Sequence, residues 1–202
     1  PSRTYKFLII TTPVGHYYSE PVNVKIEKSY TRAASGGVGR AKAAGNYAAS
    51  MYPALQAQKE GYHQLVWTDA AEHKYIEESG TMNIVFQIGD KLITPDENHD
   101  TILRGITKRS VFEIAEKWGV TVEERMITVA EIIEAAENGS LKDAFGAGTA
   151  ATIAPIAMIG YEGNKYMLPP VEERLLSNRI KKYLGDLKTG RIADEFGWNL
   201  LV

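Results

Sequence analysis

Strand-like and helix-like segments interleave along this chain of 202 residues, and that order limits the folds open to it. Runs rich in β-branched and aromatic residues predict strands at 4–12, 22–26, 63–68, 82–88, 91–94, 120–127 and 153–161. Apolar periodicity and helix-end signals predict helices at 43–59, 107–118, 128–137 and 172–187. Because the order lacks a strict strand–helix–strand rhythm, we expect one mixed α/β domain with a mixed sheet.

Turn and capping residues mark several ends of these segments. Gly89-Asp90 joins the runs 82–88 and 91–94 in a pattern typical of a β-hairpin. Thr128 and Glu131 form a capping box that predicts a helix start. Pro53, inside the Ala-rich stretch 43–59, predicts a kink or an early first turn of that helix.

Composition excludes several classes of protein. With 44% hydrophobic residues and a net charge of −2, the chain is too apolar for intrinsic disorder, and its lack of Cys excludes disulfides and thiolate chemistry. The 23 basic and 25 acidic residues leave no positive surplus for nucleic acid. The apolar run 7–10 is too short to span a membrane, and no targeting pattern follows the Pro-Ser-Arg start. We therefore expect a cytoplasmic protein, with the missing initiator Met suggesting a processed chain or a fragment.

A glycine-rich segment at 36–39, followed by Lys42, is the first candidate site. It fails as a P-loop because alanines flank Lys42, and it fails as a dinucleotide fingerprint because Lys42 stands where the third Gly belongs. No Gly-x-Ser-x-Gly elbow indicates a hydrolase. The histidines lie in separate segments without paired helical spacing, so no metal site is predicted from His16, His63, His73 and His99. On composition alone Lys42 would be interpreted as a surface lysine, but its small neighbours leave room for a flat ligand mounted on its amine.

Four motifs together carry a family resemblance. They are Gly-Gly-Val-Gly-x-x-Lys-x-x-Gly-Asn-Tyr at 36–47, Glu-Ser-Gly-Thr-Met-Asn at 78–83, Leu-Arg-Gly-Ile-Thr at 103–107 and Phe-Gly-Ala-Gly-Thr-Ala at 145–150. In this order they resemble the branched-chain amino acid aminotransferases, which are pyridoxal-phosphate enzymes of fold type IV. The resemblance covers essentially the whole chain. It implies a mixed α/β domain with a barrel-like core and flanking helices, and transamination between leucine, isoleucine or valine and 2-oxoglutarate.

The resemblance also assigns roles around the cofactor pyridoxal 5′-phosphate. Lys42 would form the Schiff base and move a proton between the substrate and the cofactor. Tyr47 would bind the phenolic oxygen of the cofactor, Glu78 its ring nitrogen, and Leu103 would pack on one face of the ring. Without the family motif, Glu78 would be interpreted as an exposed strand charge beside Glu77.

The phosphate and the substrate are assigned to three further segments. The phosphate would bind Ile106 and Thr107, at a predicted helix start with free amides, and also Thr149. The amides around Thr149 and Ala150 would receive the substrate carboxylate. Val14 and Tyr17 would contact the branched side chain of the substrate.

The chain departs from the family at its N-terminal side. Full-length members carry a smaller N-terminal domain that supplies an arginine to the phosphate, and nothing in this chain matches that domain. We expect residues 1–202 to form the large cofactor-binding domain of a homodimeric transaminase, with Arg40 or Arg104 as partial substitutes for that arginine. Three alternatives stay open: a large domain that binds the cofactor without turnover, a D-amino acid aminotransferase, and an enzyme similar to aminodeoxychorismate lyase.

Overall fold

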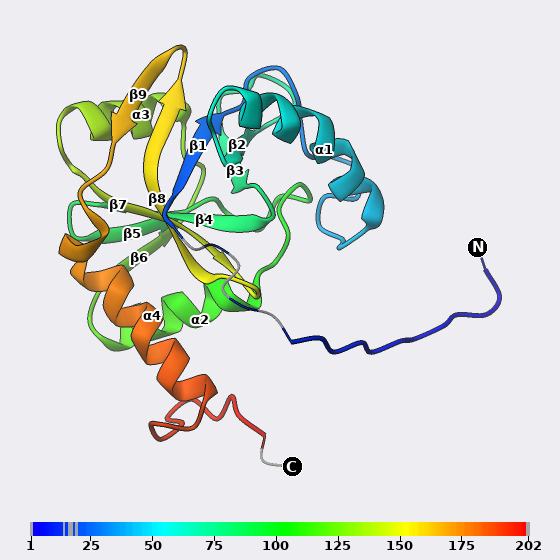
Figure 1. The fold of residues 1–202 in the computed structure, drawn as a ribbon, viewed down its shortest axis with the longest axis vertical. Helices are drawn as coiled ribbons and strands as arrows, with labels where there is room; N and C mark the ends of the chain where they lie inside the picture. Colours follow the sequence, from blue (N-terminus) through cyan, green and yellow to red (C-terminus); the bar gives the residue numbers. More distant parts are fainter. Residues whose placement is uncertain (1, 14, 16–17, 19, 201–202) are drawn as a thin grey trace.

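Strands from both halves of the chain close into a mixed barrel at the centre of the molecule (Figure 1). The computed structural model describes residues 2–13, 15, 18 and 20–200. Neighbours in the closed ring are β3 (Ile76–Ser79), β2 (Gln64–Thr68), β1 (Val22–Ile26), β8 (Thr152–Tyr161), β7 (Leu141–Gly148) and β4 (Met82–Ile88), and β4 pairs again with β3. β1 is parallel to β2 and β8, and the other pairs of the ring are antiparallel. The expected mixed α/β fold with a barrel-like core is confirmed.

Three strands extend the sheet beyond the ring. β5 (Lys91–Thr94) forms a hairpin with β4 and pairs in parallel with β6 (Thr121–Glu124), and β9 (Asn164–Met167) pairs with β8. The hairpin turns at Gly89, whose φ of +57° lies in the left-handed region that glycine adopts readily. The predicted hairpin is therefore confirmed.

Helices cover the outside of the barrel (Figure 1). α1 (Ala44–Lys59) contacts β2, α2 (Ile106–Lys117) contacts β6 and β7, and α3 (Val129–Glu137) contacts β7 and β9. A 3-10 turn (Val171–Glu173) leads into α4 (Leu175–Lys188), which contacts β8 and α2. Across the described part of the chain, no helix combines the length and apolarity that a membrane crossing needs.

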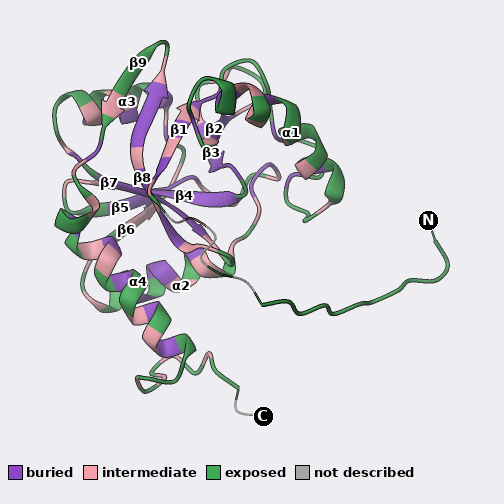
Figure 2. Cartoon of the chain, in the orientation of Figure 1, coloured by how far each residue is buried: buried purple, intermediate pink, exposed green. Residues whose placement is uncertain are grey.

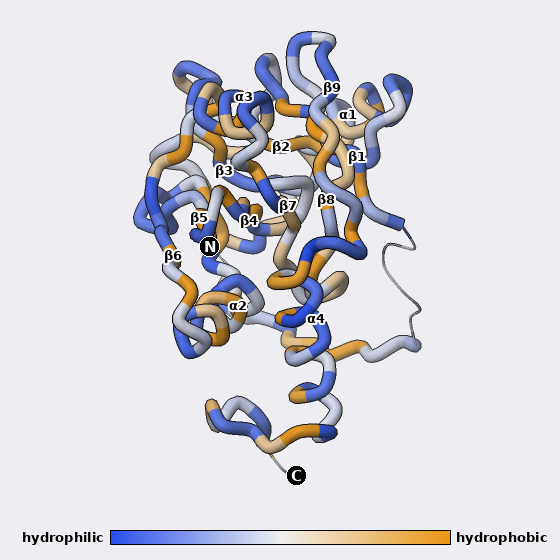
Figure 3. The backbone as a smooth tube through the Cα atoms, turned by 90° about the vertical axis from the view of Figure 1, so that its left-hand side faces the viewer, coloured by the Kyte–Doolittle hydropathy of each residue, from blue (hydrophilic) through white to orange (hydrophobic). Residues whose placement is uncertain are grey.

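Apolar side chains on opposite faces of the strands belong to separate apolar clusters of the core. In β4, Ile84 and Phe86 join one cluster, whereas Val85 joins Ile114 of α2 and Leu184 of α4 on the other face. Successive strand residues point to opposite faces, so one strand serves both clusters. Figure 2 shows the buried residues concentrated in the central strands, and Figure 3 shows polar and apolar residues alternating along α4.

Some sequence predictions need correction at segment boundaries. Residues 4–12 form no strand: they run extended and exposed, with no neighbouring strand among the described residues to satisfy their backbone groups. The strand predicted at 120–127 is only Thr121–Glu124, and the last helix begins at Leu175 instead of 172. Pro53 lies inside a continuous α1, not in its first turn.

Three strands, β3, β7 and β9, were not predicted at all. β3 has the sequence Ile-Glu-Glu-Ser and lacks an apolar alternation, while β9 is short and mostly exposed. The helix start predicted at Thr128 is confirmed, because its side chain accepts a hydrogen bond from the Glu131 N–H at 3.1 Å.

Candidate active site

The loop that carries Lys42 is held from two sides. Asn46, in the first turn of α1, donates its side-chain amide to the carbonyls of Val38 and Ala41, at 2.8 and 2.9 Å. The Gly36 N–H donates to a carboxylate oxygen of Asp100, on the loop before α2, at 2.7 Å. The glycine turn is thus fixed between α1 and the loop 95–103, which places Lys42 at a defined position.

Lys42 and Tyr47 form the first pair that the motifs predict to be close. The Lys42 Nζ donates to the Tyr47 hydroxyl oxygen at 3.1 Å, and it lies 5.0 Å from the centre of the tyrosine ring. Lys42 is exposed and Tyr47 is half-buried. The pair therefore presents an amine and a phenol side by side to a ligand that arrives from solvent.

Glu78 is buried on β3, with only 3% of its surface exposed. Its Oε1 accepts the Leu103 N–H at 2.6 Å and lies 3.3 Å from a guanidinium nitrogen of Arg32. The interpretation of Glu78 as an exposed strand charge is therefore wrong. Arg32 donates as well to the carbonyls of Thr101 and Gly39, so it ties Glu78 to both surrounding loops.

Burial raises the pKa of the Glu78 carboxyl to about 7. The positive charges of Arg32 and Lys42 and the Leu103 N–H oppose this rise, and the neighbouring Glu77 adds to it. Lys42 is thus close enough to act electrostatically on Glu78. A carboxyl with this pKa can hold or release a proton near neutral pH.

Asn83 fixes the segment that follows Leu103. It lies opposite Glu78 in the β3–β4 ladder, and its side-chain amide donates to the Leu103 carbonyl at 2.8 Å. A Cβ on Gly105 would come 1.8 Å from the Asn83 Oδ1, so this position admits only glycine without a shift. The close packing directs the Leu103 N–H toward Glu78.

The start of α2 provides unpaired backbone donors. Gly105 is its N-cap, and none of the described side chains caps the helix, so its first amides, which have no intrahelical acceptor, are left without a side-chain acceptor as well. Ile106 is 74% exposed and Thr107 is half-buried. Free amides at a helix N-terminus suit an anion such as a phosphate.

The turn between β7 and β8 lies beside the start of β4. Ala147 pairs with Asn83, and Gly148 packs against the Met82 side chain. Thr149 and Ala150 follow in this turn and are exposed. Val14 and Tyr17, expected in the substrate pocket, lie outside the described residues.

Comparison with known protein families identifies the family to which the chain belongs. Residues 1–159 match the family described as amino-transferase class IV. The chain belongs to the class IV aminotransferases. The resemblance stated from the four motifs is thereby confirmed, and the relatives named below are branched-chain aminotransferases.

Three relatives illustrate the position of this class IV aminotransferase chain. It is 42% identical to branched-chain-amino-acid aminotransferase 2 of Bacillus subtilis, over 98% of this chain and 55% of that protein. It is 41% identical to a probable branched-chain-amino-acid aminotransferase of Staphylococcus aureus, over 100% of this chain and 57% of that protein. The crystal structure of a branched-chain aminotransferase from Thermoproteus uzoniensis with norvaline superposes with a TM-score of 0.77 at 28% identity, covering 93% of this chain and 58% of that one. The chain thus spans little more than half the length of these relatives.

Sequence reasoning missed the residues that support the candidate site. Arg32 lies outside all four motifs, and no local pattern connects it to Glu78. Asn83 and Gly105 belong to the quoted motifs, but their mutual contact depends on tertiary packing. In the structure Lys42 forms a hydrogen bond with Tyr47. Thr107, in the first turn of α2, and Thr149, in the turn after β7, follow segments that contact the start of β4.

Proposed function

We propose that this chain is the cofactor-binding part of a pyridoxal-phosphate-dependent branched-chain transaminase. The observation that carries the proposal is the buried Glu78 carboxylate, paired with Arg32 and within electrostatic reach of the Lys42 amine. The names of the relatives support the substrate class of branched-chain amino acids, with 2-oxoglutarate as the expected acceptor of the amino group. A cytoplasmic location belongs to the same proposal.

The residues present fit the cofactor at the ring nitrogen. The hydrogen bond and the ion pair that the structure gives Glu78 both involve Oε1, so we propose that Oε2 accepts an N–H from a protonated pyridine ring. Tyr47 would donate to the phenolic oxygen, and the backbone of Ile106 and the hydroxyls of Thr107 and Thr149 would hold the phosphate. Leu103 would cover one face of the ring.

The cofactor supplies an electron sink for the carbon that loses its proton. Lys42 would bind the cofactor through Nζ and, once released by the substrate, accept the proton from the substrate α-carbon. Glu78, held by Arg32 and the Leu103 N–H, would keep the ring nitrogen protonated. The turn at Thr149 and Ala150 would orient the substrate carboxylate through its amides.

Cofactor loading provides the direct test. Titration with pyridoxal phosphate should produce visible absorbance, and borohydride should fix the label on the peptide that contains Lys42. Lys42→Ala should abolish the labelling, whereas Lys59→Ala, at the end of α1, should leave it unchanged. Label on another lysine of the wild-type chain would refute the assignment of Lys42.

Turnover separates the main proposal from its alternatives. Leucine with 2-oxoglutarate should yield glutamate in a protein that includes the family's small domain, and residues 1–202 alone should give weak or no turnover because one wall of the pocket is expected from that domain. Cofactor binding without any turnover in the longer protein would favour a binding-only domain. Activity on D-amino acids or a lyase product would favour the other two alternatives. Sedimentation would test the expected homodimer.

A further inference from the structure

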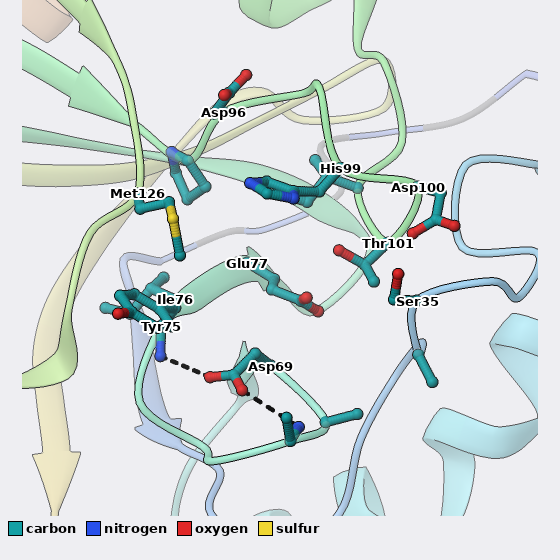
Figure 4. Close-up of a pocket in the computed structure, with 15 residues that line it drawn as sticks. Ser35, Asp69, Tyr75, Ile76, Glu77, Asp96, His99, Asp100, Thr101 and Met126 are labelled. Carbon is teal, nitrogen blue, oxygen red and sulfur yellow. Dashed lines mark hydrogen bonds between the residues drawn. The ribbon is translucent and has the colours of Figure 1, made fainter.

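Glu77 faces away from the site of Glu78. The two residues are adjacent on β3, and successive side chains of a strand point to opposite sides. Glu77 lines a cavity of about 350 Å³, between the loop that starts at Asp69, the loop 95–102 and Met126. Figure 4 shows its carboxylate directed into the space bounded by Asp69, Thr101 and Ser35.

The Glu77 carboxylate is only partly satisfied. The residue is 6% exposed, and the neighbouring Thr101 side chain favours its charged form. Its Oε2 is buried and has no hydrogen-bond partner among the described residues. A buried carboxylate oxygen without a donor is costly, so this atom marks where an N–H from a ligand would be stabilised.

The charges around the cavity are mostly negative. Asp69, Asp96 and Asp100 also line it. Burial opposes ionisation of Asp69, but the backbone N–H groups of the loop that follows it lower its pKa overall. Backbone N–H groups likewise lower the pKa of Asp96 and Asp100, so all three are ionised at neutral pH. Burial, together with the charge of Asp69, raises the pKa of the Glu77 carboxyl, and the charges of Arg32 and His99 oppose this rise.

The rest of the lining is chiefly apolar and comes from Ala70, Ile76, Pro95, Ile102 and Met126. Apolar walls around one unsatisfied polar group are typical of sites for small organic ligands. The ligand chemistry that fits is a cationic N–H donor attached to a compact apolar body.

We propose that this cavity binds a small organic cation, an amidinium or ammonium ion with an apolar body, through Glu77 Oε2. The cavity lies on the opposite side of β3 from Lys42, so this proposal does not depend on the proposed transaminase function. Nothing in the cation needs to react: the site would hold it by one charged hydrogen bond and by apolar contact.

Benzamidine and its neutral analogue benzamide test the proposal in the chain without added pyridoxal phosphate. Isothermal titration should show benzamidine binding and much weaker binding of benzamide. Glu77→Gln should weaken benzamidine by about ten-fold or more, as expected for loss of a hydrogen bond to a charged group. Ala70→Leu, which fills the cavity without changing a charge, should also remove binding.

Two controls make the result decisive. Glu78→Gln should change benzamidine affinity far less than Glu77→Gln does, because Glu78 faces the other side of β3 and contributes no atom to the cavity lining. Thermal unfolding of each variant should confirm that it is folded before its affinity is compared. Absence of benzamidine binding to the wild-type chain, equal binding of benzamide, or a loss caused by Glu78→Gln instead of Glu77→Gln would each overturn the proposal.

Discussion

Replacement of Glu78 by Gln should make the protein more stable at alkaline pH. The ordinary pKa of a Glu carboxyl is 4.5, and burial raises that of Glu78 to about 7 in the folded chain. The folded state therefore holds the proton more tightly than the unfolded state does. The stabilisation from protonated Glu78 is fully present below pH 4.5, decreases between pH 4.5 and 7, and is absent above pH 7.

The magnitude follows from the separation of the two pKa values. At about 1.4 kcal/mol per pH unit, the separation corresponds to about 3 kcal/mol of the free energy of unfolding. A glutamine at this position does not titrate, and its side-chain carbonyl can still accept from the Leu103 N–H and from Arg32. Glu78→Gln should thus match the wild type near pH 4.5 and exceed its stability by about 3 kcal/mol at pH 8.

Urea unfolding at several pH values would measure this difference, with the fluorescence of the buried Trp67 as the signal. Glu134→Gln, on the exposed face of α3, serves as the control and should follow the wild-type pH profile. The same Glu78→Gln variant should bind pyridoxal phosphate more weakly, a loss of function that accompanies a gain of stability. A Glu78→Gln protein that is equally stable or less stable at pH 8 would refute the reasoning, because the attraction of Arg32 would then outweigh the cost of burial.

Other substitutions test the packing that supports the site. Gly105→Ala should lower the free energy of unfolding by about 1–3 kcal/mol, since the new Cβ would displace Asn83, and it should also weaken cofactor uptake. Gly185→Ala in α4, where a Cβ meets no atom within 4 Å, should instead stabilise by about 0.5–1 kcal/mol in the same urea assay; destabilisation there would contradict the argument. Arg174→Met should cost about 3–5 kcal/mol, because it leaves the buried Asp143 without its ion pair at 2.9 Å, and calorimetry showing no loss would contradict this.

Local sequence patterns were sufficient to predict much of the fold. The β4–β5 hairpin, the capped start of α3 at Thr128 and the helix over 44–59 all follow from residues close together in the sequence. Lys42 and Tyr47 are five positions apart at the start of α1, so their contact is also local. Such features could be predicted because their energetics depend on neighbours within one or two turns.

The strand predictions failed where pairing with distant segments decides whether a strand forms. β3 carries two glutamates and has no strand pattern, yet pairing with β2 and β4 makes it the strand that closes the barrel. Residues 4–12 have the strand pattern but no neighbouring strand in the part of the chain that the structure describes, and a strand is stable only when its backbone groups are paired.

The sequence by itself determined the family, through four motifs that also predict Lys42, Tyr47 and Glu78 as site residues. Only the tertiary structure decided the environment of Glu78: a buried carboxyl with Arg32 beside it from 46 positions earlier and the Leu103 N–H from 25 positions later. It also separated Glu78 from Glu77, adjacent in the chain but facing opposite sides of one strand. The physical reason is that burial and charge depend on which segments the barrel brings together, and no local pattern records that.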